Sequence, residues 1–139
     1  MNLSIRNQLA GTVSSVTPGE VMAAVKIRLT GGQEITAAIT LEAVWELGIA
    51  AGTAVNALVK STEVALATGV VEGVSIRNQL PGTVTGIKAG DAMASVKITV
   101  PGGELTSAVT EEAVTDLGLV TGSTVVALIK STEVSLATV

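Results

Sequence analysis

The sequence of 139 residues repeats itself almost from end to end. Residues 3–9 return as residues 74–80, and residues 55–64 return as residues 125–134. The offset between the copies is 71 residues up to a Gly-Gly pair and 70 after it, and about 38 of 65 paired positions are identical. Such similarity indicates a true duplication. It predicts two domains, residues 1–69 and residues 70–139, which meet at the glycine-flanked segment 69–73.

Each half is small for an independent hydrophobic core. A unit of about 65 residues is only marginally stable alone, and this chain has no Cys for disulfides, no Phe, no Tyr and a single Trp. Hydrophobic residues still make up 47% of the chain. We therefore expect the surplus apolar surface to be buried between the halves and between chains, which predicts an obligate oligomer.

The composition argues against several functional classes. Without Cys or His, the chain has no thiolate or imidazole metal ligand, no Cys nucleophile and no Ser-His triad. It has no glycine-rich phosphate loop and no close carboxylate pair beside a nucleophile, so we expect no enzymatic activity. A net charge of −4, with Trp45 as the only aromatic residue, weighs against a nucleic-acid partner.

Two further patterns concern the cellular compartment. No charge-free stretch reaches the roughly 18 residues that a membrane helix needs, so we expect no membrane partner. The N-terminal residues lack the basic segment and apolar core of a signal peptide. The expected location is the cytoplasm.

The hydrophobic pattern predicts a mainly β fold. The residues expected as strands of the first half are 13–16, 22–29, 34–39, 53–60 and 63–67. Between the third and fourth strands, residues 40–48 change to a helical pattern, with Thr40 as N-cap and Gly48 after the last turn. The second half repeats this plan, with its helix at residues 110–118.

Five strands with one short helix are the plan of an OB-like barrel. The expected fold class is therefore all-β, with two tandem OB-like five-stranded barrels. The sequence leaves open whether the first strand of one half is exchanged with another half.

Six of the eight cationic residues occur at matching positions of both halves: Arg6 and Arg77, Lys26 and Lys97, Lys60 and Lys130. Lys26 and Lys97 lie in the middle of alternating strands, which predicts exposed positions on a sheet.

Arg6 and Arg77 each follow a serine by two residues, so hydroxyl and guanidinium point the same way if the chain is extended there. Two interpretations are open. Either both groups face an anion, or the arginine is solvated beside a turn formed by Asn7 or Asn78.

Two other repeated segments carry the same ambiguity. In each half, a Lys-Ser-Thr segment connects two predicted strands: Lys60-Ser61-Thr62 and Lys130-Ser131-Thr132. Each segment is either a nest that binds an oxyanion or an ordinary polar hairpin. Thr40 and Thr110 suit a helix N-cap, a position that also favours anions. Acidic residues in the same first turn, Glu42 and Glu112, weaken that inference.

The ordered motifs resemble the Mop family of molybdate-binding domains over essentially all of both halves. They are Ser-Ile-Arg-Asn-Gln-Leu-x-Gly-Thr-Val, Gly-Gly, Ala-Ile-Thr-x-Glu-Ala-Val and Leu-Val-Lys-Ser-Thr-Glu-Val. Two such domains without a helix-turn-helix or ATPase segment resemble the free-standing tandem, or di-Mop, members. The resemblance implies OB-like domains that bind molybdate, and also tungstate, between subunits. It further implies a homotrimer with a role in intracellular molybdenum storage or homeostasis.

Carried over by position, the oxyanion ligands of the family fall on ten residues: Ser4, Arg6, Thr40, Lys60, Ser61, Ser75, Arg77, Thr110, Lys130 and Ser131. Family members often have Ala after the lysine. We therefore expect Ser61 and Ser131 to contribute backbone N–H groups first and hydroxyls second. Asn7 and Asn78 also match the family motif, and we assign them to the turn.

The leading hypothesis is a protein that stores or buffers molybdate without catalysis. Molybdate offers four acceptor oxygens and no donor, so its site needs N–H and O–H groups with one or two positive charges. A second hypothesis is another OB-fold role, in binding single-stranded nucleic acid or oligosaccharide. A third is a structural assembly module in which the repeated Arg and Lys form interface pairs.

Overall fold

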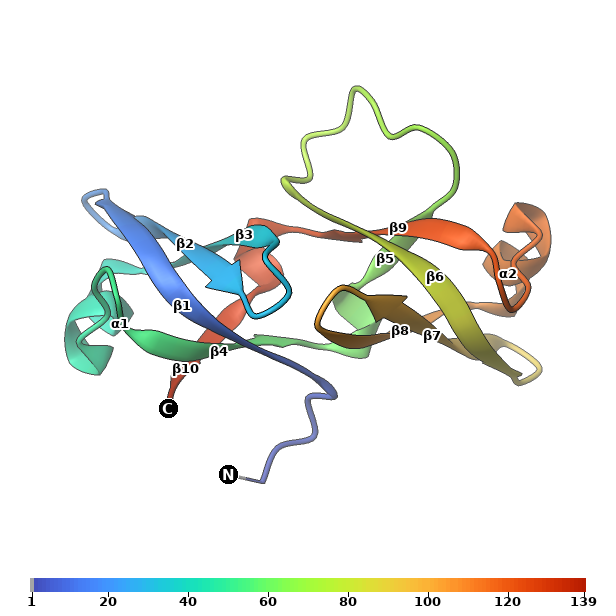
Figure 1. The fold of residues 1–139 in the computed structure, drawn as a ribbon, viewed down its shortest axis with the longest axis horizontal. Coiled ribbons are helices and arrows are strands. Elements are labelled where there is room, and N and C mark those ends of the chain that lie inside the picture. Colours follow the sequence, from blue (N-terminus) through green and yellow to red (C-terminus); the bar gives the residue numbers. More distant parts are fainter. Residues whose placement is uncertain (1) are drawn as a thin grey trace.

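The computed structural model describes residues 2–139 and shows two five-stranded antiparallel sheets joined side by side (Figure 1). The elements of the first repeat are β1 (Asn7–Pro18), β2 (Met22–Leu29), β3 (Glu34–Thr40), α1 (Leu41–Leu47), β4 (Ala54–Val59), the 3₁₀ turn η1 (Ser61–Glu63) and β5 (Ala65–Ala67). Those of the second are β6 (Asn78–Ala89), β7 (Met93–Val100), β8 (Gly103–Thr110), α2 (Glu111–Leu117), β9 (Thr124–Ile129), η2 (Ser131–Glu133) and β10 (Ser135–Thr138). The mainly β class with one short α-helix per repeat is confirmed.

Local sequence explains the short helices. The Thr40 hydroxyl accepts a hydrogen bond of 3.1 Å from the Ala43 N–H, and Gly48 ends α1 at φ 64°, a conformation that costs glycine little. Thr110 caps α2 in the same way, through Ala113. The predicted caps are therefore confirmed at both helices.

Each sheet takes its fifth strand from the other repeat. The strand orders are β10-β4-β1-β2-β3 and β5-β9-β6-β7-β8. Ser135 of β10 lies opposite Leu58 of β4, and Ala65 of β5 lies opposite Leu128 of β9. The exchange that the sequence left open therefore takes place inside one chain, and it involves the last strand of each repeat rather than the first.

The hydrophobic core runs through both halves. Alternate residues of β2, among them Val25 and Ile27, are fully buried, as the period of two requires. Their counterparts in β7, Val96 and Ile98, belong to the same contiguous cluster of buried side chains. Burial of apolar surface between the halves, expected from their small size, is confirmed.

The chain passes from one sheet to the other through two short segments, residues 60–64 and residues 130–134, which we call the first and second crossovers. The turn η1 of the first crossover packs against β8, and η2 of the second packs against β3. Each crossover therefore lies where the two sheets meet.

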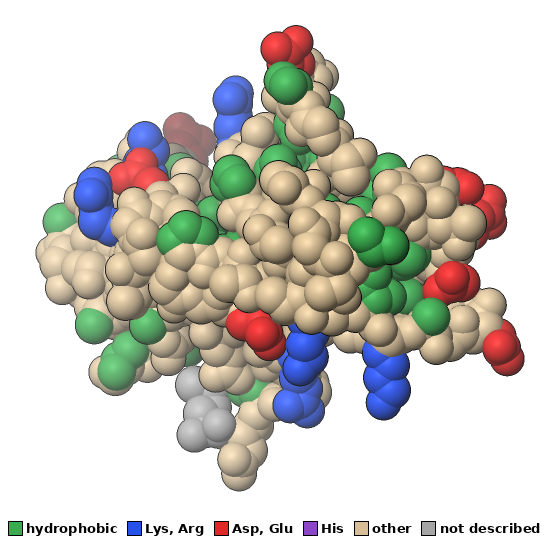
Figure 2. Space-filling view, turned by 45° about the vertical axis from the view of Figure 1, so that its right-hand side comes forward, with side chains coloured by type: hydrophobic (Ala, Val, Ile, Leu, Met, Phe, Trp, Pro, Cys, Tyr) green, Lys and Arg blue, Asp and Glu red, His purple; other side chains and the backbone are tan. Residues whose placement is uncertain are grey.

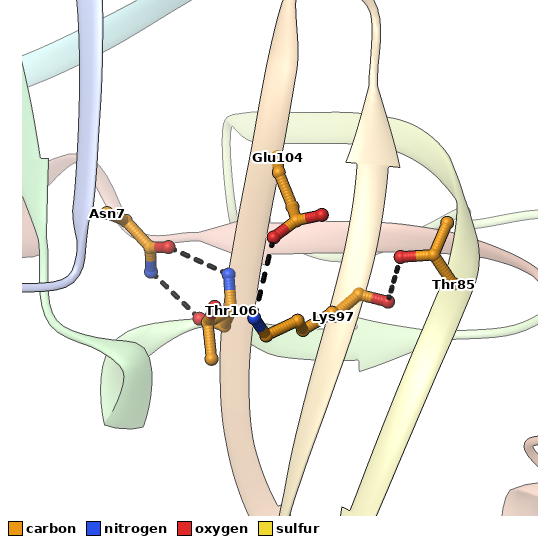
Figure 3. Close-up of polar contacts among 5 residues, drawn as sticks. All are labelled: Asn7, Thr85, Lys97, Glu104 and Thr106. Atoms are coloured by element: carbon orange, nitrogen blue, oxygen red, sulfur yellow. Dashed lines mark hydrogen bonds and ion pairs between the residues drawn. The ribbon is translucent and has the colours of Figure 1, made fainter.

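Two asparagines bind the sheets together, and this corrects their assignment to a turn. Asn7 begins β1, is almost fully buried, and makes two hydrogen bonds of 2.8 Å with the backbone N–H and C=O of Thr106 in β8 (Figure 3). Asn78 makes the same pair of bonds with Thr36 in β3. The amide replaces the backbone partner that an edge strand lacks, because it has one donor and one acceptor side by side.

The hairpin that joins β2 to β3 also meets the hairpin that joins β7 to β8. The Gln33 side chain donates a hydrogen bond of 2.9 Å to the Pro101 carbonyl oxygen. A Cβ atom added at Gly31 would collide with the backbone of Pro101, and one added at Gly102 would lie 2.6 Å from the Gly31 nitrogen. Only glycine allows this close approach.

We expect Gly31→Ala to lower the free energy of unfolding by about 2–3 kcal/mol, because backbone atoms of the facing hairpin must shift. Denaturant unfolding followed by circular dichroism measures this change. The matched control is Gly86→Ala in β6, where an added Cβ meets nothing within 4 Å. Equal stability of the two variants would contradict the packing described here.

No helix within residues 2–139 is long and apolar enough to span a membrane.

Candidate functional site

The sheet register places the repeated cations next to each other. Asn7, the first residue of β1, pairs with Val59, the last residue of β4. Arg6 and Lys60, the next residues beyond this pair, therefore lie next to each other. In the second sheet, Asn78 pairs with Ile129, and Arg77 and Lys130 follow in the same way. Each sheet therefore presents an arginine and a lysine together at the start of a crossover.

A groove of about 290 Å³ marks this place in the second half. It is lined by Ser75, Ile76, Arg77, Lys130, Ser131 and Thr132. The structure thus brings together four of the five residues predicted for the second site. In the first half, the register brings Arg6 to the matching end of the sheet, next to Lys60, and Ser4 and Ser61 adjoin these two residues in the sequence.

Among residues 2–139, these cations have no carboxylate partner. Arg6, Lys60, Arg77 and Lys130 are exposed, and on the face in Figure 2 the Lys and Arg side chains stand out from the surface. The one ion pair within residues 2–139 joins Lys97 of β7 and Glu104 of β8 at 3.8 Å (Figure 3) and involves none of these four cations. Two adjacent positive charges without a counterion favour an external anion.

Carboxylates do lie nearby. Glu63 and Glu133 of the two crossovers line a second groove, of about 250 Å³, together with Lys130. Neither carboxylate comes within 4.0 Å of a cation in the described part of the chain. They reduce the positive potential around the crossovers without neutralising a particular side chain.

The crossovers also offer backbone donors. Each begins with one 3₁₀ turn, closed by hydrogen bonds from Glu63 to Lys60 at 2.9 Å and from Glu133 to Lys130 at 3.0 Å. The first N–H groups of such a turn, here those of Ser61 and Thr62, have no partner inside it. Lysine, serine and free N–H groups together form a set suited to an oxyanion.

Thr40 and Thr110 stand apart from this set within one chain. Their hydroxyls already accept the capping hydrogen bonds of α1 and α2, and neither residue lines the groove of the second half. A hydroxyl that accepts a bond can still donate its own proton. The structure assigns both threonines a structural role and leaves an anion-binding role as a prediction.

Lys26 and Lys97 are exposed in the middle of β2 and β7, which confirms the prediction for the third pair of repeated cations. Sequence reasoning missed Ser107, whose hydroxyl reaches the end of the first crossover. No repeat could reveal this residue, because its counterpart is Ala37.

The whole chain is similar to known proteins. The family model of the TOBE domain matches twice, at residues 3–66 and residues 74–136. A structure of the cytoplasmic molybdate-binding protein ModG, with molybdate bound, superposes with a TM-score of 0.97 at 43% identity and covers 100% of both chains.

Two relatives have similar sequences over 99% of this chain. The molybdenum transport protein ModE of Herbaspirillum seropedicae is 37% identical over 139 residues. The molybdenum-pterin-binding protein MopB of Rhodobacter capsulatus is 40% identical over 141 residues. The chain spans about half the length of these two relatives, 52% in each case. These matches confirm the family resemblance and the OB-like fold.

Proposed function

The chain belongs to the TOBE domain family, with two copies of the domain, and from this premise we propose that it binds molybdate without catalysing a reaction. The observation that carries the proposal is the pairing of arginine and lysine at each crossover, beside hydroxyl and N–H groups and without a carboxylate partner in the described part of the chain. The fold shared with a molybdate-bound protein over the full chain supports it.

The donor set suits a tetrahedral dianion. Charge-assisted hydrogen bonds from Arg77 and Lys130 offset the cost of removing molybdate from water, and Ser75, Ser131 and backbone N–H groups satisfy the remaining oxygens. In the first half, Ser4, Arg6, Lys60 and Ser61 have these roles. Charge does not separate molybdate from sulfate, so selectivity depends on the size of the cavity. Tungstate, with the same charge and shape, is bound as well.

We place the complete sites between chains of a homotrimer. The groove of the second half is open to solvent and Thr110 lies outside it, so a neighbouring chain supplies this threonine, and Thr40 in the first half by the same reasoning. Exposed apolar side chains support an oligomer, among them Val21, Met22, Trp45, Met93 and Val120. Their burial against another chain stabilises the assembly.

The role we propose is storage or buffering of molybdenum in the cytoplasm. The solved structure with the same fold is of a cytoplasmic protein, and the relatives are named for molybdenum transport or molybdenum-pterin binding. A buffering protein needs a reversible site and no catalytic groups.

Thermal unfolding tests the proposal. Molybdate at a hundredfold excess over its Kd stabilises the folded state by about 2.7 kcal/mol per site by mass action. For a chain of this length we expect the Tm to rise by about 5–10 °C. Sulfate at equal concentration and ionic strength is the control and should raise the Tm much less. An unchanged Tm at millimolar molybdate and tungstate would contradict the proposal.

A further inference from the structure

The two crossovers have the same sequence, Lys-Ser-Thr-Glu-Val, but they are not anchored alike. Ser107 of β8 is fully buried, and its hydroxyl donates a hydrogen bond of 2.6 Å to the carbonyl oxygen of Val64, the last residue of the first crossover. The matching position in β3 is Ala37, equally buried and without a hydroxyl to offer Val134. The first crossover therefore has an anchoring bond that the second lacks.

The crossover serines also differ in their surroundings. The hydroxyl oxygen of Ser61 is buried and has no hydrogen-bond partner in the described part of the chain. Ser131, at the matching position, lines the open groove of about 290 Å³ with Arg77 and Lys130. The same motif is thus anchored in one half and not in the other, although corresponding residues of the two crossovers are exposed to a similar degree.

We infer that Ser107 is a positioning residue that makes the two oxyanion sites of one chain unequal, with the tighter site at the first crossover. The inference rests on the proposed function and names the residue that sets the order of filling. An anchored segment loses less conformational freedom when an ion binds, because its donors are already in place. The second crossover forms the same 3₁₀ turn without this anchor, so it loses more freedom when it binds an ion, binds it more weakly and releases it sooner.

Hydrogen–deuterium exchange of the full-length protein, read by mass spectrometry, tests both sites separately. Peptides covering residues 60–66 and residues 130–136 report on the first and second crossovers during a molybdate titration. Without ligand, we expect slower exchange in residues 60–66. With molybdate, their protection should reach its midpoint at about a fivefold lower concentration, as one net hydrogen bond implies.

Ser107→Ala places in β8 the residue that β3 has at the matching position, so the substitution fits a strand of this kind. It should speed exchange in residues 60–66 and bring the two midpoints within about twofold of each other, with residues 130–136 unchanged. The reciprocal variant Ala37→Ser should lower the midpoint of residues 130–136. If Ala37→Ser does not fold, Ser107→Ala alone decides the result.

The outcomes separate the inference from the proposed function. Equal midpoints in the unmodified protein would overturn the inference and leave molybdate binding intact. A Ser107→Ala protein that unfolds at lower temperature but keeps the original ratio of midpoints would also overturn it, because Ser107 would then be merely structural. Absence of molybdate protection in both peptides would overturn the proposed function, and the inequality of the sites with it.

Discussion

Molybdate binding should weaken by about ten- to a hundredfold when Arg6 and Arg77 are both replaced by alanine. Each substitution removes one charge-assisted hydrogen-bond donor from one site. The expected loss of binding free energy is about 1.5–3 kcal/mol per site. The remaining lysine then faces the dianion alone. Isothermal titration calorimetry on the metal-free protein measures the change in Kd.

The matched control is the pair Lys26→Ala and Lys97→Ala. It removes the same number of positive charges, also from repeated positions, but from the exposed middle of β2 and β7. We expect its Kd to stay within about twofold of the unmodified value, because neither lysine belongs to a proposed site and salt screens exposed surface charges. If replacing the lysine pair weakened binding as much as replacing the arginine pair, net charge would govern the affinity for molybdate, rather than the arginine and lysine at each crossover. Unchanged calorimetry for the arginine pair would remove both residues from the sites.

Stability should fall most when Asn7 and Asn78 are replaced by alanine together. Each substitution leaves the backbone N–H and C=O of a threonine in the facing strand, Thr106 or Thr36, without their side-chain partners in a largely buried contact. The expected loss is about 2 kcal/mol per site and about 4 kcal/mol for both, since unsatisfied buried groups are costly. Urea unfolding measures this change.

Gln8 and Gln79 provide the control for the asparagine pair. They are the next residues along the chain, are exposed, and donate hydrogen bonds only to the nearby carbonyls of Ile5 and Ile76. Their joint replacement by alanine should change the free energy of unfolding by less than about 1 kcal/mol. A loss for the asparagine pair no larger than this would show that the sheets are held together by apolar packing alone.

The sequence predicts the elements of this fold well where local signals determine them. Alternation marks β2 at the observed bounds, 22–29, and the capping residues Thr40 and Gly48 mark the helix between β3 and β4. The strand exchange has no such signal. The strand β5 has only three residues, Ala65–Ala67, too few for a pattern that would identify its partner sheet. The path of the crossover decides the partner.

In the candidate sites, too, the sequence predicts some features and misses others. Duplication singles out Arg6 and Lys60, and the register of β1 with β4 then brings them together. The asparagine that follows Arg6 carries a structural role that spacing alone did not reveal, because its partner Thr106 lies 99 residues away. Ser107 could not be predicted for a different reason. It differs between the repeats, whereas the predicted site residues are those that occur at matching positions of both halves.

The central claim is that the arginine, lysine and serine residues at the two crossovers bind molybdate itself. The most direct measurement strips the purified protein of bound metal, equilibrates it with molybdate by dialysis against excess sulfate, and counts molybdenum per chain. We predict saturable binding that sulfate does not abolish, and at least tenfold weaker binding by the protein without Arg6 and Arg77. Molybdenum that fails to accumulate above its concentration in the dialysis buffer, or that the excess sulfate displaces completely, would contradict the account.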